Sequence, residues 1–138
     1  MDPNEVFEYL TRGIELLAIG SLIYTGGLLG LAIAHVFSQR INSQDELEER
    51  VTEEALKLGL DPLSIKAKYN GVVNGVRKNG EYYDLHLTGD NLLCTNRAGV
   101  RHELYHVHRG DMEHSSFFRY FFLEEPRALL YGSLKIKL

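Results

Sequence analysis

The residues with the clearest chemical meaning are two histidines and a glutamate in the segment His102-Glu103-Leu104-Tyr105-His106. Residues four apart on an α-helix project from the same face, so the two imidazoles can occupy two tetrahedral positions around Zn²⁺. Glu103 follows the first histidine, where a carboxylate can take a proton from metal-bound water as general base. The leading hypothesis is therefore zinc-dependent hydrolysis of peptide bonds.

A short amphipathic helix should present these side chains. We expect it to cover residues 97 to 109, with Asn96 as N-cap and Gly110 as the residue that ends it. On a helical wheel, His102 and His106 lie opposite an apolar stripe that would anchor the helix to a core. This stripe consists of Val100, Leu104 and Val107. The alternative is an amphipathic helix whose polar face carries two histidines without a metal.

A catalytic zinc site needs three protein ligands and one open position. The segment from Ser115 to Tyr131 predicts a second helix that is apolar on nearly every side but contains Glu124 and Glu125. A buried carboxylate without a partner costs several kcal/mol, so these acids need a cation or contact with water. Either glutamate is a candidate ligand, and His114 is a weaker one. The alternative is a solvated edge of the helix.

The two segments together resemble the gluzincin family of zinc metallopeptidases, and most closely a minigluzincin. The resemblance covers roughly residues 80 to 132. The third ligand of gluzincins is a glutamate often followed by a small residue three positions on, and thermolysin-like members have a glycine seven positions on. Glu125 fits both features, through Ala128 and Gly132, whereas Glu124 fits neither. Leu129 departs from the pattern, because many gluzincins have an aspartate there that hydrogen-bonds the first zinc-bound histidine.

The resemblance implies one catalytic Zn²⁺ held by His102, His106 and Glu125. It also implies a tyrosine or histidine that stabilises the oxyanion, for which Tyr131 is our choice. The other candidates for this role are His108, His114 and Tyr120. Minigluzincins resemble latent enzymes, so the tail from Ser133 to Leu138 could lie as a strand in the cleft or complete the sheet.

The second informative feature is an apolar segment. From Leu16 to Val36 only the titratable His35 could carry a charge, and about twenty such residues make a helix long enough to cross a bilayer. We predict a single transmembrane helix at about 14 to 37, the alternative being a core helix, and expect His35 to lie far from the motif. Gly26 and Gly30 have the spacing that could pair two such helices in a homodimer.

Charge and composition complete the prediction. More basic residues follow the apolar segment than precede it, so we expect the catalytic domain in the cytoplasm. The net charge of −4 and the absence of a basic stripe argue against nucleic-acid binding. A single cysteine, Cys94, rules out an intramolecular disulfide framework.

The predicted fold class is α+β. Residues 1–42 would form an N-terminal tail and the membrane helix, and residues 43–138 a small metallopeptidase-like domain. A capped helix after Ser43 would precede a mixed or antiparallel sheet, a meander of three or four strands between residues 63 and 96. His86 would be a strand residue rather than a ligand, and the strand at 91 to 96 a candidate edge for binding peptide.

Two other classes of function remain open from the sequence. One is a membrane-tethered module that binds zinc without catalysis. The other is a metal-free adaptor that contacts proteins through its helices.

Overall fold

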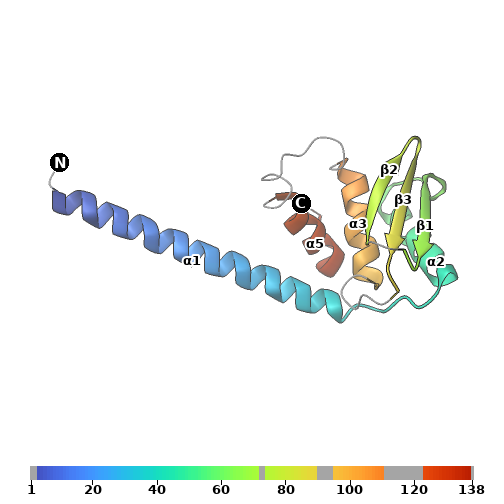
Figure 1. The fold of residues 1–138 in the computed structure, drawn as a ribbon, viewed down its shortest axis with the longest axis horizontal. Coiled ribbons are helices and arrows are strands. Elements are labelled where there is room, and N and C mark those ends of the chain that lie inside the picture. Colours follow the sequence, from blue (N-terminus) through green and yellow to red (C-terminus); the bar gives the residue numbers. More distant parts are fainter. Residues whose placement is uncertain (1–2, 72–73, 90–94, 111–122, 138) are drawn as a thin grey trace. The chain divides into compact units, whose positions relative to one another are not determined.

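The computed structural model describes residues 3–71, 74–89, 95–110 and 123–137 (Figure 1). Its contacts divide the chain into two compact units, Met1–Gly30 and Leu31–Leu138. The second unit therefore includes residues 31–42, which we had assigned to the N-terminal part.

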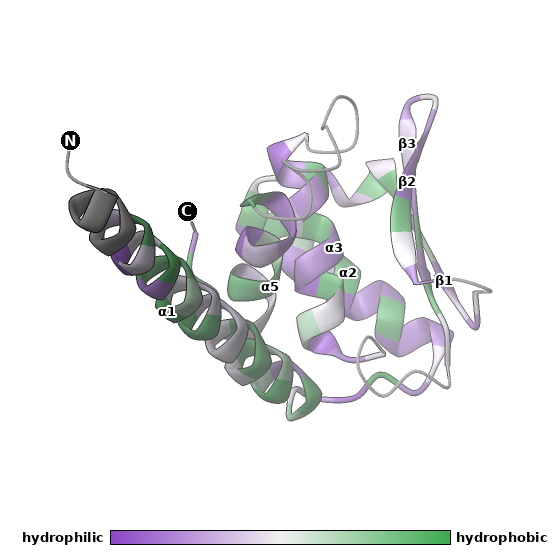
Figure 2. Cartoon of the chain, turned by 60° about the vertical axis from the view of Figure 1, so that its left-hand side comes forward, coloured by the Kyte–Doolittle hydropathy of each residue, from purple (hydrophilic) through white to green (hydrophobic). Residues whose placement is uncertain are grey.

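The first helix, α1 (Pro3–Val36), contains the predicted apolar segment. Its part from Tyr9 to Val36 is long and apolar enough to cross a membrane, although a signal sequence near the N-terminus meets the same criteria. Apolar residues dominate the middle of α1 in Figure 2. Large side chains such as Leu17 and Leu22 are exposed in this stretch, so the helix presents apolar surface to its surroundings.

The capped helix after Ser43 is α2 (Gln44–Leu58), as predicted. The Ser43 hydroxyl accepts a hydrogen bond from the Glu46 backbone N–H at 3.2 Å, and the Glu46 carboxylate accepts one from the Asn42 N–H at 3.0 Å. In a standard capping box this carboxylate would bind the N–H of the N-cap residue Ser43, so here it binds the N–H one residue earlier. The predicted apolar face is buried and consists of Leu47, Val51, Ala55 and Leu58.

A 3₁₀ turn at Pro62–Ser64 leads into a three-stranded mixed sheet with the order β1-β3-β2. Its strands are β1 (Ile65–Tyr69), β2 (Gly75–Asn79) and β3 (Tyr82–Leu87). β1 is parallel to β3, and β2 is antiparallel to it. The α+β class is confirmed, but the predicted meander is wrong, because β1 and β2 are not neighbours. Leu85 and Leu87 of β3 are fully buried, which favours the central position for this strand.

Within the second unit, two helices cover one face of the sheet: α2 packs on β1, and α3 (Arg97–Arg109) packs on β2. α5 (Glu125–Leu134) packs on the side of α3 that faces away from the sheet, as Figures 1 and 2 both show. The helix that carries the two histidines is therefore the middle layer, between the sheet and the glutamate helix.

The C-terminal prediction needs correction. α5 ends at Leu134 instead of Tyr131, and Lys135 closes it with a φ of 60°. Ser133 and Leu134 belong to this helix and residues 135–137 form no strand, so the predicted tail strand is wrong for these residues. The start predicted at Ser115 and residues 91–94 of the strand predicted at 91 to 96 lie outside the described residues. The latency implied by the resemblance stays a prediction.

A buried ion pair joins α2 to α3. The Glu54 side chain is 1 % exposed, and its Oε1 lies 2.7 Å from Nε of Arg97 and 3.2 Å from Nζ of Lys57. A buried carboxylate is stable only with such partners, so this contact favours one relative placement of the two helices.

Replacing Glu54 with alanine should lower the free energy of unfolding by about 2 to 3 kcal/mol, somewhat less than for a fully buried pair, because Arg97 is partly exposed. Thermal and urea unfolding of the full chain in detergent measures this. Glu49→Ala, at an exposed position of the same helix, is the control. Equal stability of the two variants would contradict the role assigned to Glu54.

Candidate metal site

The helix bearing the two histidines has the predicted bounds. The Asn96 side chain accepts a hydrogen bond from the Gly99 N–H at 2.9 Å, and Gly110 ends α3 in the left-handed conformation. Two other N-terminal amides of the helix bind the segment after α1: Ala98 N–H donates to Ser38 Oγ at 3.0 Å and Arg97 N–H to the Gln39 carbonyl at 2.8 Å. Because these amides would otherwise lack partners within the helix, that segment stabilises the start of α3.

The predicted stripe of Val100, Leu104 and Val107 is buried in the core. The histidine face is turned toward α5, where the carboxylate of Glu125 approaches both imidazoles. Glu125 Oε2 lies 3.3 Å from His102 Nε2, and Oε1 lies 3.4 Å from His106 Nε2. One potential ligand atom from each of the three residues lies within 4.8 Å of the others.

These distances fit a zinc ion. Two ligand atoms at 2.0–2.1 Å from a tetrahedral ion are about 3.4 Å apart, close to both measured N···O separations. The donor set of two imidazoles and one carboxylate is that of a catalytic zinc site with one open position. The same separations would also suit ion pairs between Glu125 and protonated histidines. The geometry therefore defines a candidate metal site, and measuring the metal content of the protein distinguishes the two cases.

The three side chains differ in exposure. His106 is 4 % exposed, His102 14 % and Glu125 32 %. The site is therefore closed on the His106 side and reachable by solvent on the Glu125 side.

A close backbone contact positions α5 on α3. A Cβ added at Gly132 would lie 2.8 Å from the Ala98 carbonyl oxygen and 3.1 Å from His102 Cβ. Arg101, which is 5 % exposed, donates from Nε to the Gly132 carbonyl at 2.7 Å, and its Nη2 donates to the same oxygen. The resemblance had drawn attention to Gly132, and the structure gives the physical reason: only glycine permits this approach beside a proposed ligand.

Glu103 projects from α3 toward the sheet. The backbone N–H of Val76 in β2 donates a hydrogen bond to its carboxylate. Burial raises the pKa of Glu103 above the ordinary value of 4.5, and the Glu125 charge acts in the same direction, while His102 and His106 oppose the shift. A carboxylate with a raised pKa beside two candidate metal ligands is a candidate general base.

Two other predicted site residues, Tyr131 and His108, lie in different surroundings. Tyr131 is 4 % exposed and stacks on Tyr105 in the core, with ring centroids 4.9 Å apart. This gives Tyr131 a packing role, and its action as an oxyanion donor stays a prediction. His108 is exposed on α3, and its ring lies 6.0 Å from that of Tyr105.

The alternative third ligands have different outcomes. Glu124 is 3 % exposed and immediately precedes α5, so the predicted solvated edge is wrong for this residue. It does not belong to the three-residue group that could hold a metal. His114 and Tyr120 lie outside the described residues.

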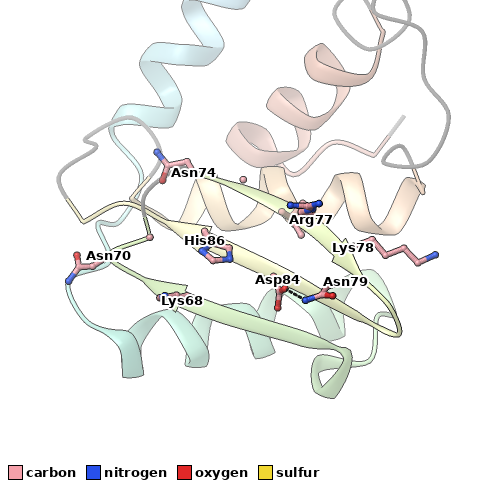
Figure 3. A pocket seen from close by; sticks show the side chains of 11 residues that line it. Lys68, Asn70, Asn74, Arg77, Lys78, Asn79, Asp84 and His86 are labelled. Carbon is pink, nitrogen blue, oxygen red and sulfur yellow. Dashed lines mark hydrogen bonds between the residues drawn. The ribbon is translucent and has the colours of Figure 1, made fainter.

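His86 lies on the face of the sheet that is turned away from α2 and α3, because its neighbours Leu85 and Leu87 point into the core. A pocket lined mostly by polar residues lies on this outer face (Figure 3). Asp84 Oδ2 accepts a hydrogen bond from Asn79 Nδ2 at 2.8 Å within it. Its lining includes Lys68, Asn70, Asn74, Arg77, Asp84 and His86. His86 is therefore a residue of strand β3, as expected, and lies on the opposite face of the sheet from the helix that carries His102 and His106.

Gly132→Ala should separate α5 from α3, since the added methyl group would overlap a backbone oxygen. We expect a loss of about 1 to 3 kcal/mol in the free energy of unfolding, together with weaker zinc binding. Unfolding curves and chelator competition measure the two effects. Gly13→Ala, at a helical position where the added Cβ meets nothing within 4 Å beyond the helix's own backbone, should neither lower the free energy of unfolding nor weaken zinc binding. Normal stability and zinc binding in Gly132→Ala would contradict the proposed contact.

Glu103→Gln should stabilise the metal-free protein at neutral pH. A raised pKa in the folded state means that the charged carboxylate opposes folding; this penalty is absent below pH 4.5 and complete above the folded-state pKa. The variant should therefore have the higher melting temperature at pH 7 in EDTA, and this advantage should vanish toward pH 4. Glu49→Gln is the control. A less stable Gln variant at pH 7 would refute the burial argument.

Comparisons of the chain with protein-family models, with curated proteins and with solved structures found no match. The resemblance to gluzincins therefore remains a prediction from the residues that carry it, and the three-residue group is described by its own geometry.

Proposed function

We propose that the protein is a membrane-anchored zinc metallopeptidase that cleaves peptide bonds. The observation that carries the proposal is the approach of one carboxylate, from Glu125, to the Nε2 atoms of two histidines at 3.3 and 3.4 Å. Glu103, with its raised pKa, lies between those histidines in the sequence. A ligand triad and a proton acceptor thus come from two packed helices.

His102, His106 and Glu125 would hold the ion. Zinc bound there would lower the pKa of a bound water and polarise the scissile carbonyl. Glu103 accepts the proton of the attacking water and delivers it to the amine that leaves. The Val76 N–H hydrogen bond orients the carboxylate for this transfer. The chain's donor for the oxyanion is not assigned, because Tyr131 lies in the core.

The peptide would lie along β2. This strand is at an edge of the described sheet, and its Val76 N–H contacts Glu103 from α3. An extended substrate can add to such an edge through main-chain hydrogen bonds. β2 is thus a second candidate edge beside the segment at 91 to 96. Of that segment, Asn96 caps α3 and forms an isolated bridge with Arg40, and residues 91–94 lie outside the described residues.

The apolar helix would anchor the enzyme in the membrane, with the catalytic domain in the cytoplasm. Tyr9 to Val36 is sufficient in length and apolar character, and the positive-inside rule gives the orientation. An added Cβ at Gly26 or Gly30 would meet no heavy atom within 4 Å. The small-residue face is therefore open within α1 for close packing of a second copy in a homodimer.

A second candidate function is a tethered zinc-binding or protein-interaction module without catalysis. The burial of Tyr131 favours it, because a tyrosine stacked in the core is poorly placed to reach a substrate. Substitution of Glu103 separates the two functions, because only catalysis requires that carboxylate.

Zinc content of the purified full chain tests the ligand assignment. We expect about one zinc per chain in the wild type and in His108→Ala, and loss of zinc in His106→Ala and Glu125→Ala. Elemental analysis gives the stoichiometry. Glu103→Gln should retain zinc and cleave a fluorogenic peptide mixture at least about a hundredfold more slowly.

Each contrary result has a definite meaning. If Glu125→Ala keeps its zinc while Glu124→Ala loses it, the third ligand is misassigned. Full zinc in the wild type without any peptide cleavage would favour the non-catalytic module. A wild-type chain without zinc, even after incubation with the ion, would refute both zinc functions.

A further inference from the structure

His35 lies next to the candidate metal site, contrary to the expectation that it would be far from the motif. Its ring packs edge-on against that of His102, with centroids 6.1 Å apart, and the residue is only 6 % exposed. The sequence separates these two histidines by more than sixty positions. A buried imidazole in this place calls for a defined role among its polar neighbours.

The hydrogen bonds around His35 indicate its tautomer. Ser133 Oγ donates to the Leu31 carbonyl at 3.0 Å, and it also lies 3.4 Å from His35 Nδ1. A hydroxyl group has only one proton to donate. Because the Ser133 hydroxyl donates it to the Leu31 carbonyl, its oxygen can only accept a hydrogen bond from His35 Nδ1. Nδ1 of His35 then carries the proton, and in the neutral ring Nε2 is an acceptor.

His102 has the complementary requirement. Its Nε2 is turned to Glu125 and the proposed metal, so in a neutral ring the proton is on Nδ1. Metal-bound histidines almost always donate this second N–H to an acceptor, which orients the ring and raises its basicity. His102 Nδ1 is buried, with no hydrogen-bond partner among the described residues. Leu129 cannot supply one, because its side chain has no polar atom.

We propose that His35 is the positioning residue for the metal ligand His102, accepting the His102 Nδ1–H at its own Nε2. This inference rests on the proposed zinc site and deepens it. A hydrogen-bonded series would then run from the Leu31 carbonyl through Ser133 and His35 to His102. With ring centroids 6.1 Å apart, the two rings must move closer for the last bond to form.

The same contacts connect metal binding to the end of the apolar helix. The His35 carbonyl accepts a hydrogen bond from Asn96 Nδ2 at 3.0 Å, and the following residues cap α3 through Ser38 and Gln39. The last turn of α1 thus belongs to the folded unit that holds the site. Because linkage is reciprocal, bound zinc stabilises the docking of this turn as much as docking strengthens zinc binding.

Two substitutions of His35 test the proposal in the full chain in detergent. His35→Phe keeps a ring of similar size without an acceptor, and His35→Gln restores an acceptor. Zinc affinity measured by chelator competition should fall about 10- to 100-fold in His35→Phe and by less than about threefold in His35→Gln. The visible spectrum of the Co²⁺-substituted protein should change in His35→Phe only. His108→Phe, on the exposed face of α3, is the matched control.

Thermal unfolding of the metal-free variants distinguishes positioning from packing. A packing role alone would lower the melting temperature of His35→Phe but leave the zinc affinity of its folded fraction and the Co²⁺ spectrum as in the wild type, and that result would overturn the inference. Equal losses of affinity in His35→Phe and His35→Gln would also overturn it. In both cases the wild type still binds zinc, so the proposed function survives. No zinc uptake by the wild type would overturn both.

Discussion

The close contact between α5 and α3 is the constraint on which the site depends. Gly132 brings the two helices so near that a methyl group would touch the Ala98 carbonyl, and Arg101 ties the Gly132 carbonyl to α3. Glu125 lies two turns before this contact on α5 and is thereby brought to both histidines. A longer distance between the helices would leave one imidazole without a carboxylate. Packing of backbone on backbone therefore sets the geometry of a site made of side chains.

The second dependence is on segments remote in the sequence. α3 begins with amides bound by Asn96 from its own cap and by Ser38 and Gln39 from the chain after α1. On the side of α3 that faces the sheet, the Glu103 carboxylate accepts a hydrogen bond from the Val76 N–H of the edge strand β2. The helix is thus held at its start, on its apolar stripe and at the Glu103 carboxylate. Such multiple support holds the side chains of the candidate site within a narrow range of positions.

Local signals predicted most elements, because each depends on a few neighbouring residues. The capping serine of α2 and the asparagine and glycine that bound α3 act within one helical turn, so their effect can be read from the chain. The strand order could not be read in this way. Alternation in β1 and β3 predicts strands but not their partners, and the pairing of β3 with both others follows from burial of Leu85 and Leu87, a property of the assembled core.

By itself, the sequence determined that two imidazoles share one helical face, with a carboxylate beside them, since a spacing of four residues has that consequence in any α-helix. It also determined a long apolar helix, from length and composition alone. Only the tertiary structure decided the rest: that Glu125 meets both imidazoles while Glu124 does not, that Tyr131 is in the core, and that His35 lies against His102. These relations depend on how helices pack across many intervening residues, because packing is selected by the shape and burial of the whole core and not by local spacing.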